Sequence, residues 1–366
     1  MDGRERLLTA LANGKPDRLP VQVHNWMAYY LDNYLGGCDA LAAYERFGMD
    51  KVLYVGPRPE YSPADLARWQ AERRTVGHTP EGDTLWVERI ATPEGDLVGR
   101  GARNAMTEWQ TECLIKTPHD FALFERYAPA PIRLDPAPVI EAQRRVGAEG
   151  IVRGWAAGYG QGSPWQDLCI LMGTEQAILS AIDDPAFTHH ALGVLLEKRL
   201  RFVELLQGVP LDLVEAGGGA ASNTVISPRL FREFVLPYDV VQTEALHAAG
   251  MRVVYHLCGG LMHMLEMVAE MGADGLETMT PPGMGGDCDL AEAERRVGRR
   301  LFFVGGFDQS TGLERGTPEA VREQVFALHA ACPEGGYVCS PSDHFFHGDP
   351  ENLAAFVAAA RECVYA

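Results

Sequence analysis

Basic side chains, cysteines and long apolar runs are all scarce in this chain of 366 residues. Lysine and arginine number 32 against 50 aspartate and glutamate residues, which gives a formal charge of −18. A protein this acidic has little with which to neutralise a phosphate backbone, so a nucleic-acid-binding role is disfavoured. The eight cysteines are too few for a disulfide scaffold in a chain of this length.

No apolar run approaches the roughly 18 residues that a membrane-spanning helix requires. The first 20 residues also lack the apolar core of a signal peptide. Hydrophobic residues nevertheless make up 46% of the chain, which excludes a disordered protein. We therefore expect a cytoplasmic, packed protein with reduced cysteines, and we keep a homodimer as one option for its assembly.

Apolar, β-rich runs alternate with longer helical patterns along the chain, which is typical of parallel strands joined by helices. The runs are residues 21–25, 51–56, 151–158, 211–218, 252–260, 275–279, 301–308 and 336–343. Eight such runs predict an α/β fold, a (β/α)8 TIM barrel that forms a single domain over residues 1–366. An open doubly wound sheet is the main alternative, but no Gly-x-Gly-x-x-Gly motif follows the first run.

Residues 84–116 depart from this alternation of strands and helices. Their side chains alternate in strand fashion on both sides of a Pro-Glu-Gly turn at 93–95. This pattern predicts a β-hairpin insertion between strands two and three of the barrel.

Catalytic groups of TIM barrels lie at the carboxyl ends of the strands. The polar residues found where the predicted strands end are His24, Asn25, Tyr159, Gln161, Glu215, His256, Cys258, Glu277, Asp308, Gln309, Cys339, Asp343 and His344. This set is rich in groups that bind metals or transfer protons.

The strongest local signal is the pair His256 and Cys258, because residues i and i+2 of a strand point the same way. An imidazole and a thiolate on one face make half of a tetrahedral zinc site. Cys339, on the last predicted strand, is a candidate third ligand, and Cys288 competes with it. Three protein ligands with an open fourth position are typical of a catalytic zinc. The alternative is that these buried thiols only fill the core.

Glu215 and His344 are the candidate catalytic residues. Glu215 can handle a proton or serve as a displaceable fourth ligand, or it can be a carboxylate satisfied by backbone N–H groups. His344 can contact the substrate or cap the following helix. The candidate substrate-binding residues, each of which can also be structural, are His24, Tyr159, Gln161, Asn223 and Glu277. Residues 217–219 are three glycines that permit close approach of backbone or ligand.

The chain resembles the uroporphyrinogen decarboxylase superfamily along almost its whole length. The segments that carry the resemblance are RER (4–6), GKPDRLPV (14–21), TPEG (92–95), IKTP (115–118), ISP (226–228), FREFVLPY (231–238), FVGGFD (303–308), SDH (342–344) and PENL (350–353). Their order and spacing together are specific. The resemblance implies a single (β/α)8 barrel.

Two branches of this superfamily differ in chemistry. The decarboxylases carry an arginine-rich stretch after the first strand that holds porphyrin carboxylates. Residues 26–45 of this chain contain no arginine or lysine. A porphyrin with several carboxylates would therefore have no cation to bind there, which disfavours the decarboxylase branch. The other branch, zinc-dependent methyltransferases that work with corrinoid proteins, is similar to this chain in the His-x-Cys motif and a later cysteine. This resemblance implies that His256, Cys258 and Cys339 are the zinc ligands.

The resulting hypothesis is a zinc-dependent methyltransferase that moves a methyl group between a small substrate and a corrinoid. The substrate would be a thiol or a methylated O, N or S compound. The chain has no recognisable B12-binding segment, so the corrinoid (methylcobalamin) would be carried by a partner protein. Two alternatives stay open: a decarboxylase-like lyase, and a zinc-dependent hydrolase or C–S lyase on the same barrel.

Overall fold

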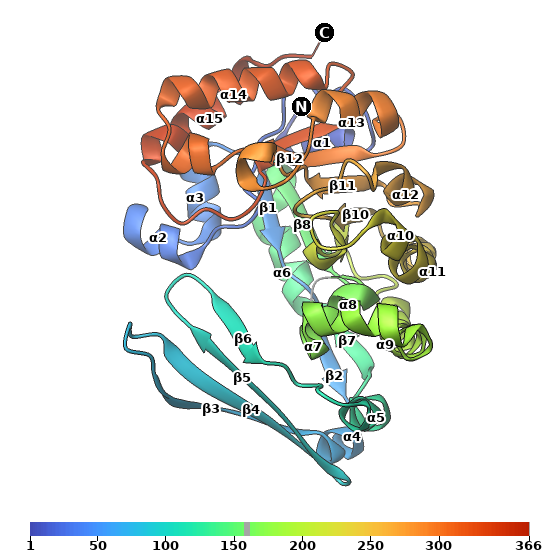
Figure 1. The fold of residues 1–366 in the computed structure, drawn as a ribbon. Helices are drawn as coiled ribbons and strands as arrows, with labels where there is room; N and C mark the ends of the chain where they lie inside the picture. Colours follow the sequence, from blue (N-terminus) through green and yellow to red (C-terminus); the bar gives the residue numbers. More distant parts are fainter. Residues whose placement is uncertain (157–161, 366) are drawn as a thin grey trace.

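The computed structural model of the protein describes residues 1–156 and 162–365. Its largest sheet has seven parallel strands in the order β1-β8-β9-β10-β11-β12-β13 (Figure 1). The strands are β1 (Lys51–Tyr54), β8 (Gly150–Trp155), β9 (Leu213–Gly217), β10 (Val253–His256), β11 (Gly275–Thr278), β12 (Phe302–Phe307) and β13 (Tyr337–Pro341). They overlap seven of the eight predicted runs, so the predicted parallel α/β sheet is confirmed.

The eighth run, residues 21–25, pairs with the sheet at only one residue, and this corrects the predicted first strand. Val21 forms a parallel bridge with Cys339 of β13, and its carbonyl accepts the backbone N–H of Asp50 at 3.0 Å. The N–H of Val21 donates to the Asp50 carboxylate at 3.0 Å. Because a side chain takes this donor, a backbone ladder cannot extend here. The two edges of the barrel-like sheet are thus joined through Val21.

Helices follow most of the strands and surround the sheet (Figure 1). They are α1 (Gly3–Ala10), α2 (Ala28–Tyr34), α3 (Ala40–Phe47), α4 (Pro63–Arg68), α5 (Pro118–Tyr127), α6 (Ala137–Val146), α7 (Pro164–Met172), α8 (Thr174–Asp183), α9 (Pro185–Glu204), α10 (Pro228–Leu230), α11 (Leu236–Ala248), α12 (Leu265–Glu270), α13 (Leu290–Val297), α14 (Pro318–Ala331) and α15 (Pro350–Glu362). Leu7 of α1 and nearby Leu11 border the small internal cavity that Val52 and Val338 also line. None of the described helices is both long and apolar enough to cross a membrane.

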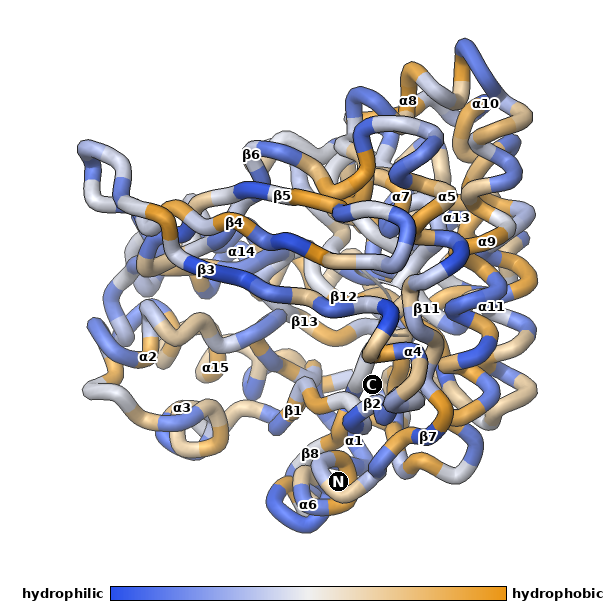
Figure 2. The backbone as a smooth tube through the Cα atoms, turned by 90° about the horizontal axis from the view of Figure 1, so that it is seen from below, coloured by the Kyte–Doolittle hydropathy of each residue, from blue (hydrophilic) through white to orange (hydrophobic). Residues whose placement is uncertain are grey.

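The segment between β1 and β8 is larger than the predicted hairpin. It forms a four-stranded antiparallel sheet of β3 (Gln70–His78), β4 (Thr84–Thr92), β5 (Gly95–Arg103) and β6 (Glu108–Glu112). A second, two-stranded sheet pairs β2 (Arg58–Tyr61) with β7 (Pro131–Asp135). The four-stranded sheet projects from the barrel-like sheet (Figure 1), and hydrophilic residues predominate along its edge strand β3 (Figure 2). That edge shows no apolar alternation, so the sequence pattern did not reveal it.

Asp50 makes the contacts that join the sheet edges. It is 2% exposed, and its carboxylate also accepts from Arg6 at 2.6 Å and from Arg18 at 3.2 Å. We expect Asp50→Ala to lower the free energy of unfolding by about 3–5 kcal/mol, because it leaves Arg6 buried without this partner. Urea unfolding measures the loss.

Asp17 provides the matched control, since it bonds the same Arg6 side chain but is itself 39% exposed. Asp17→Ala should cost about 1 kcal/mol or less. Equal losses in the two variants would contradict the role given to Asp50.

Candidate functional site

The Arg153 side chain points into the interior enclosed by the barrel-like sheet and is 1% exposed. It projects from β8 and binds Glu277 of β11 through two hydrogen bonds of 2.8 and 2.9 Å. The same guanidinium donates to Glu215 of β9 at 2.8 Å and lies 4.5 Å from the Tyr54 ring centroid. Three neighbouring parts of the sheet therefore share one buried cation.

The two glutamates have opposite ionisation tendencies. Burial raises the pKa of Glu215 well above its usual value, and the negative charge of Glu277 raises it further. Burial acts in the same sense on Glu277, but the charge of Arg153 and a hydrogen bond with His256 hold the pKa of Glu277 well below its usual value. Of the two, Glu277 thus favours the ionised form and Glu215 the protonated form.

His256 ends β10 and is 2% exposed. Its Nδ1 lies 3.0 Å from Glu277 Oε1 and 3.9 Å from Glu215 Oε1. Burial disfavours the charged imidazole, but hydrogen bonds with Cys258 and Glu277 raise the pKa of His256 well above its usual value. With Nδ1 held by a carboxylate, Nε2 is the ring nitrogen left for another partner.

Cys258 lies beside His256, as the period-two rule predicts, and is partly exposed. The glycines that follow β9 make room for this segment. A Cβ at Gly219 would come within 2.4 Å of the Cys258 Sγ, and one at Gly217 within 2.5 Å of the His256 carbonyl oxygen. The predicted role of residues 217–219 in close approach is therefore confirmed for Gly217 and Gly219.

Thr278, directly after Glu277, has a left-handed backbone with φ of 80°. A β-branched residue rarely adopts this conformation, which costs about 1–3 kcal/mol and persists only where the surroundings impose it. Its hydroxyl donates to the carbonyl of Leu257, between His256 and Cys258, at 2.9 Å. The strained exit of β11 therefore fixes the exit of β10.

His24 connects this group to the loop after β13. Its ring centroid lies 5.5 Å from that of His256 and 5.2 Å from that of His344. Burial lowers the pKa of His24 to about 3, so its imidazole is neutral at pH 7.

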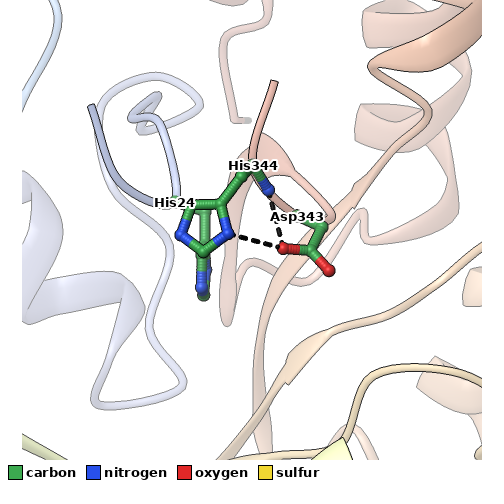
Figure 3. A group of neighbouring side chains, drawn as sticks. All are labelled: His24, Asp343 and His344. Carbon is green, nitrogen blue, oxygen red and sulfur yellow. Dashed lines mark hydrogen bonds and ion pairs between the residues drawn. The ribbon is translucent and has the colours of Figure 1, made fainter. Parts of the chain in front are cut away.

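Asp343 and His344 lie next to His24 on the loop after β13 (Figure 3). The Oδ1 of Asp343 accepts the His344 backbone N–H at 2.7 Å and lies 3.0 Å from the His344 ring. Although burial acts the other way, these contacts lower the pKa of Asp343 to about 2. Gln309 supports the loop, since its side chain donates to the His344 carbonyl and accepts from the Ser342 N–H.

Two groups of described residues bring possible metal-ligand atoms within 4.8 Å of one another. The first is His24, Asp343 and His344, and the second is His24, His256 and Glu277. His24 belongs to both, and neither contains a cysteine. Imidazole and carboxylate donors of this kind suit zinc and other divalent transition metals.

Cys339 is not brought to the His256–Cys258 pair. Along β13, Val338 lines the internal cavity that Arg153 also borders, so the next residue points to the outer face. The Cys339 thiol accordingly lies beside Tyr337, and burial raises the pKa of Cys339 to about 12. The competing candidate Cys288 is also buried, and burial raises its pKa to about 12. Its backbone N–H donates to the Thr280 carbonyl.

The remaining predicted residues are less central. Tyr159 and Gln161 lie outside the described residues. Asn223 packs next to Gly260, to whose carbonyl its backbone N–H donates at 2.7 Å. Glu277 was predicted to bind substrate, but both of its oxygens are engaged by Arg153 and His256 and it is 0% exposed. Its role in the structure is to orient those two side chains.

Arg153 is the main residue of the site that the sequence prediction missed. Its signal was a single charged residue inside the apolar run 151–158, where a strand buried on both faces should carry none without a partner. The sequence pattern marks Asp343 only as a polar residue at a strand end.

The uroporphyrinogen decarboxylase (URO-D) family model matches residues 114–363. The chain belongs to this family. The uroporphyrinogen decarboxylase of Shewanella loihica is 31% identical over 217 residues, which are 55% of this chain and 57% of that protein. The enzyme of Neisseria meningitidis serogroup C (FAM18) is 34% identical over 151 residues, or 38% of each chain. The matches thus span 57% and 38% of the length of these two curated relatives.

A solved methyltransferase from Methanosarcina mazei has the same fold as this URO-D family member. The TM-score is 0.66 with 18% identity, and the alignment covers 99% of both chains. At this identity the match establishes the fold and not the activity.

The stability of this protein should depend on the charge balance around Arg153. We expect Arg153→Gln to lower the free energy of unfolding by about 3–5 kcal/mol, because Glu277 then stays buried without its cation. The double variant Arg153→Gln with Glu277→Gln should recover part of this loss, because it removes the unpaired charge as well. Denaturant unfolding of the two single variants and the double variant gives the coupling energy. Strictly additive losses would contradict the coupling.

Proposed function

We propose that this protein is a zinc-dependent methyltransferase that moves a methyl group between a small substrate and a corrinoid carried by a partner protein. The observation that carries the proposal is that His24 meets His256 on one side and the Asp343–His344 loop on the other at the carboxyl ends of the strands, with Cys258 hydrogen-bonded to His256. The methyltransferase from Methanosarcina mazei, which shares the fold, supports this choice of reaction.

The residues present fit a zinc ion. The imidazoles of His24 and His256 lie close enough to share one ion, and Asp343 and His344 reach His24 in the same way. Cys258, which hydrogen-bonds His256, would be the thiolate ligand in place of Cys339. Glu277 on Nδ1 of His256 is the carboxylate–histidine arrangement that typically orients a metal-ligating imidazole. His24 is neutral at pH 7, as a ligand must be, whereas His256 would release its proton on binding the ion.

A zinc ion held there would supply a Lewis acid that activates a thiol or a methylated heteroatom. The chain's own residues have separate tasks. Glu215 keeps a proton close to His256, at 3.9 Å from its Nδ1, and is the candidate for handling the substrate's proton. His344, which is partly exposed, faces His24 and is the candidate substrate contact from the loop after β13.

A decarboxylase-like lyase is the second candidate, because the curated relatives are uroporphyrinogen decarboxylases. The chain offers little for a porphyrin with several carboxylates: residues 26–45, which include α2, carry no lysine or arginine. Arg153 is already engaged by two glutamates. A methylated or thiol substrate without negative charge fits these surroundings better. A zinc-dependent hydrolase or C–S lyase would use the same ligands without a corrinoid.

Zinc content tests the ligand set. Protein purified without chelator should contain about one zinc per chain, and Cys258→Ala and His256→Ala should each reduce this to less than about 0.3. Cys339→Ala is the matched control, because that thiol lies on the outer face of β13, and it should retain the full content. Loss of zinc in Cys339→Ala with retention in Cys258→Ala would reverse the assignment.

Methyl transfer tests the reaction. In one assay, free cob(I)alamin is mixed with the protein and a panel of methylated donors. In the other, methylcobalamin is mixed with the protein and a panel of thiol acceptors. The absorbance of the corrinoid is followed in both. The wild type should convert at least one pair, and the zinc-depleted Cys258→Ala variant should be slower by at least about 100-fold. If no donor or acceptor changes the spectrum while the protein binds zinc, the hydrolase or lyase is favoured. Release of CO2 from uroporphyrinogen would favour the decarboxylase.

A further inference from the structure

Helices α7 and α9 lie beside β2 and α4 (Figure 1), and a cavity of about 560 Å³ lies between them. We call it the junction pocket. Its described walls come from β2, α4 and the first residues of β3 and β7 on one side, and from α7 and α9 on the other. Small-molecule sites have volumes of about 300–1,000 Å³ and often lie where two structural units meet. None of its described walls belongs to the group around Arg153 and His24.

One face of α9 forms the inner wall of the junction pocket. Leu195, Arg199 and Phe202 stand four and three residues apart along the helix, so their side chains point the same way. Each of them is at most 4% exposed. Across the cavity, Tyr61 of β2 pairs with Pro131 of β7 at a shift in register, a feature that turns side chains in a new direction. The junction pocket is therefore formed by regular elements on both sides.

Two aromatic side chains of the junction pocket carry polar groups that have no partner. Trp69, which follows α4, is 8% exposed, yet its indole N–H makes no hydrogen bond within residues 1–156 and 162–365. The Tyr61 hydroxyl has no partner there either. Burial alone raises the pKa of Tyr61, so no nearby charge acts strongly on this hydroxyl. Buried tryptophan and tyrosine side chains usually bond their polar groups, so both groups are left for a ligand.

The charged groups of the junction pocket, in contrast, are already matched. Arg199 and Asp167 of α7 form two hydrogen bonds of 2.7 Å, and both side chains are 1% exposed. The Nζ of Lys198 donates at 2.8 Å to the carbonyl of Ala128, the residue that caps the C-terminal end of α5. The negative end of a helix dipole favours a cation. The described walls therefore offer no unpaired charge to a ligand.

We propose that the junction pocket binds an uncharged small molecule that has a flat aromatic ring and a carbonyl oxygen. Leu66, Trp69 and Phe202 supply apolar and aromatic surface for the ring. The Trp69 N–H and the Tyr61 hydroxyl supply donors for the oxygen. A charged ligand would lose its hydration without gaining an opposite charge. This site shares no residue with the proposed zinc ligands and does not depend on the proposed function.

Fluorescence titration of the full-length protein with prodan tests the site. Prodan is an uncharged naphthalene that carries a ketone, and its emission moves to shorter wavelength when the dye leaves water. Saturable binding of about one dye per chain is expected. Tyr61→Phe should weaken this binding by about three- to tenfold, because it removes one hydrogen bond to the ketone. Benzamide should displace prodan at concentrations at least about tenfold lower than benzoate, its charged analogue.

Leu66 and Leu179 provide a matched pair of variants. Leu66 of α4 lines the junction pocket and is 45% exposed, whereas Leu179 of α8 is 44% exposed and does not line it. Leu66→Ala should weaken prodan binding by about fivefold, because the ring loses apolar contact. Leu179→Ala should bind prodan as the wild type does. Because both leucines are exposed, circular dichroism should show that both variants stay folded.

Three outcomes would overturn the proposal: no saturable binding of prodan, equal affinity in Leu66→Ala and wild type, or displacement by benzoate at lower concentrations than by benzamide. The last outcome would assign the junction pocket to an anion held by Lys198. Zinc content should be the same in Leu66→Ala as in the wild type, so failure of this proposal and failure of the proposed function are distinguishable.

Discussion

Burial of the Arg153 guanidinium in the interior enclosed by the barrel-like sheet is the constraint on which the site depends. A cation removed from water is costly unless opposite charge and hydrogen bonds surround it. Here β9 and β11, the strands that flank β10, each supply a glutamate, and the Tyr54 ring covers the cation. The negative charge of Glu277 adds to burial in raising the pKa of Glu215, whereas Arg153 and His256 hold the pKa of Glu277 low. The charges around Arg153 thereby shift the pKa values of Glu215, Glu277 and His256.

The orientation of His256 follows from that balance. Glu277 is fixed by Arg153, and its remaining acceptor capacity takes the Nδ1 of His256. The strained Thr278, directly after Glu277, bonds the Leu257 carbonyl and so holds the chain between His256 and Cys258. Strain of this size needs rigid surroundings, which the buried ion pairs provide. Glu277 therefore acts through its neighbours, and this explains why a residue at a strand end need not contact a substrate.

The sequence predicted the alternation of strands and helices well, because continuous apolar runs mark strands buried on both faces. The same property hid which way each side chain points. In β10 the pair His256 and Cys258 could be recognised because polar side chains stand two residues apart. In β13 both faces are apolar, so nothing in the pattern distinguished Val338 inside from Cys339 outside. Arg153 was missed for a related reason: its partners come from strands 62 and 124 residues later, and only the fold brings them together.

The backbone of Cys339, and not its thiol, contributes to the site. Its N–H and carbonyl bond the residues on either side of Val21, which sets the register between β13 and the N-terminal segment. His24 lies three residues beyond the pair of Val21 and Cys339 on one segment, and Asp343 and His344 lie four and five residues beyond it on the other. The rings of His24 and His344 meet there, with centroids 5.2 Å apart. Asp50 fixes the other side of Val21. The closure of the sheet and the assembly of the His24, Asp343 and His344 group are therefore consequences of the same register.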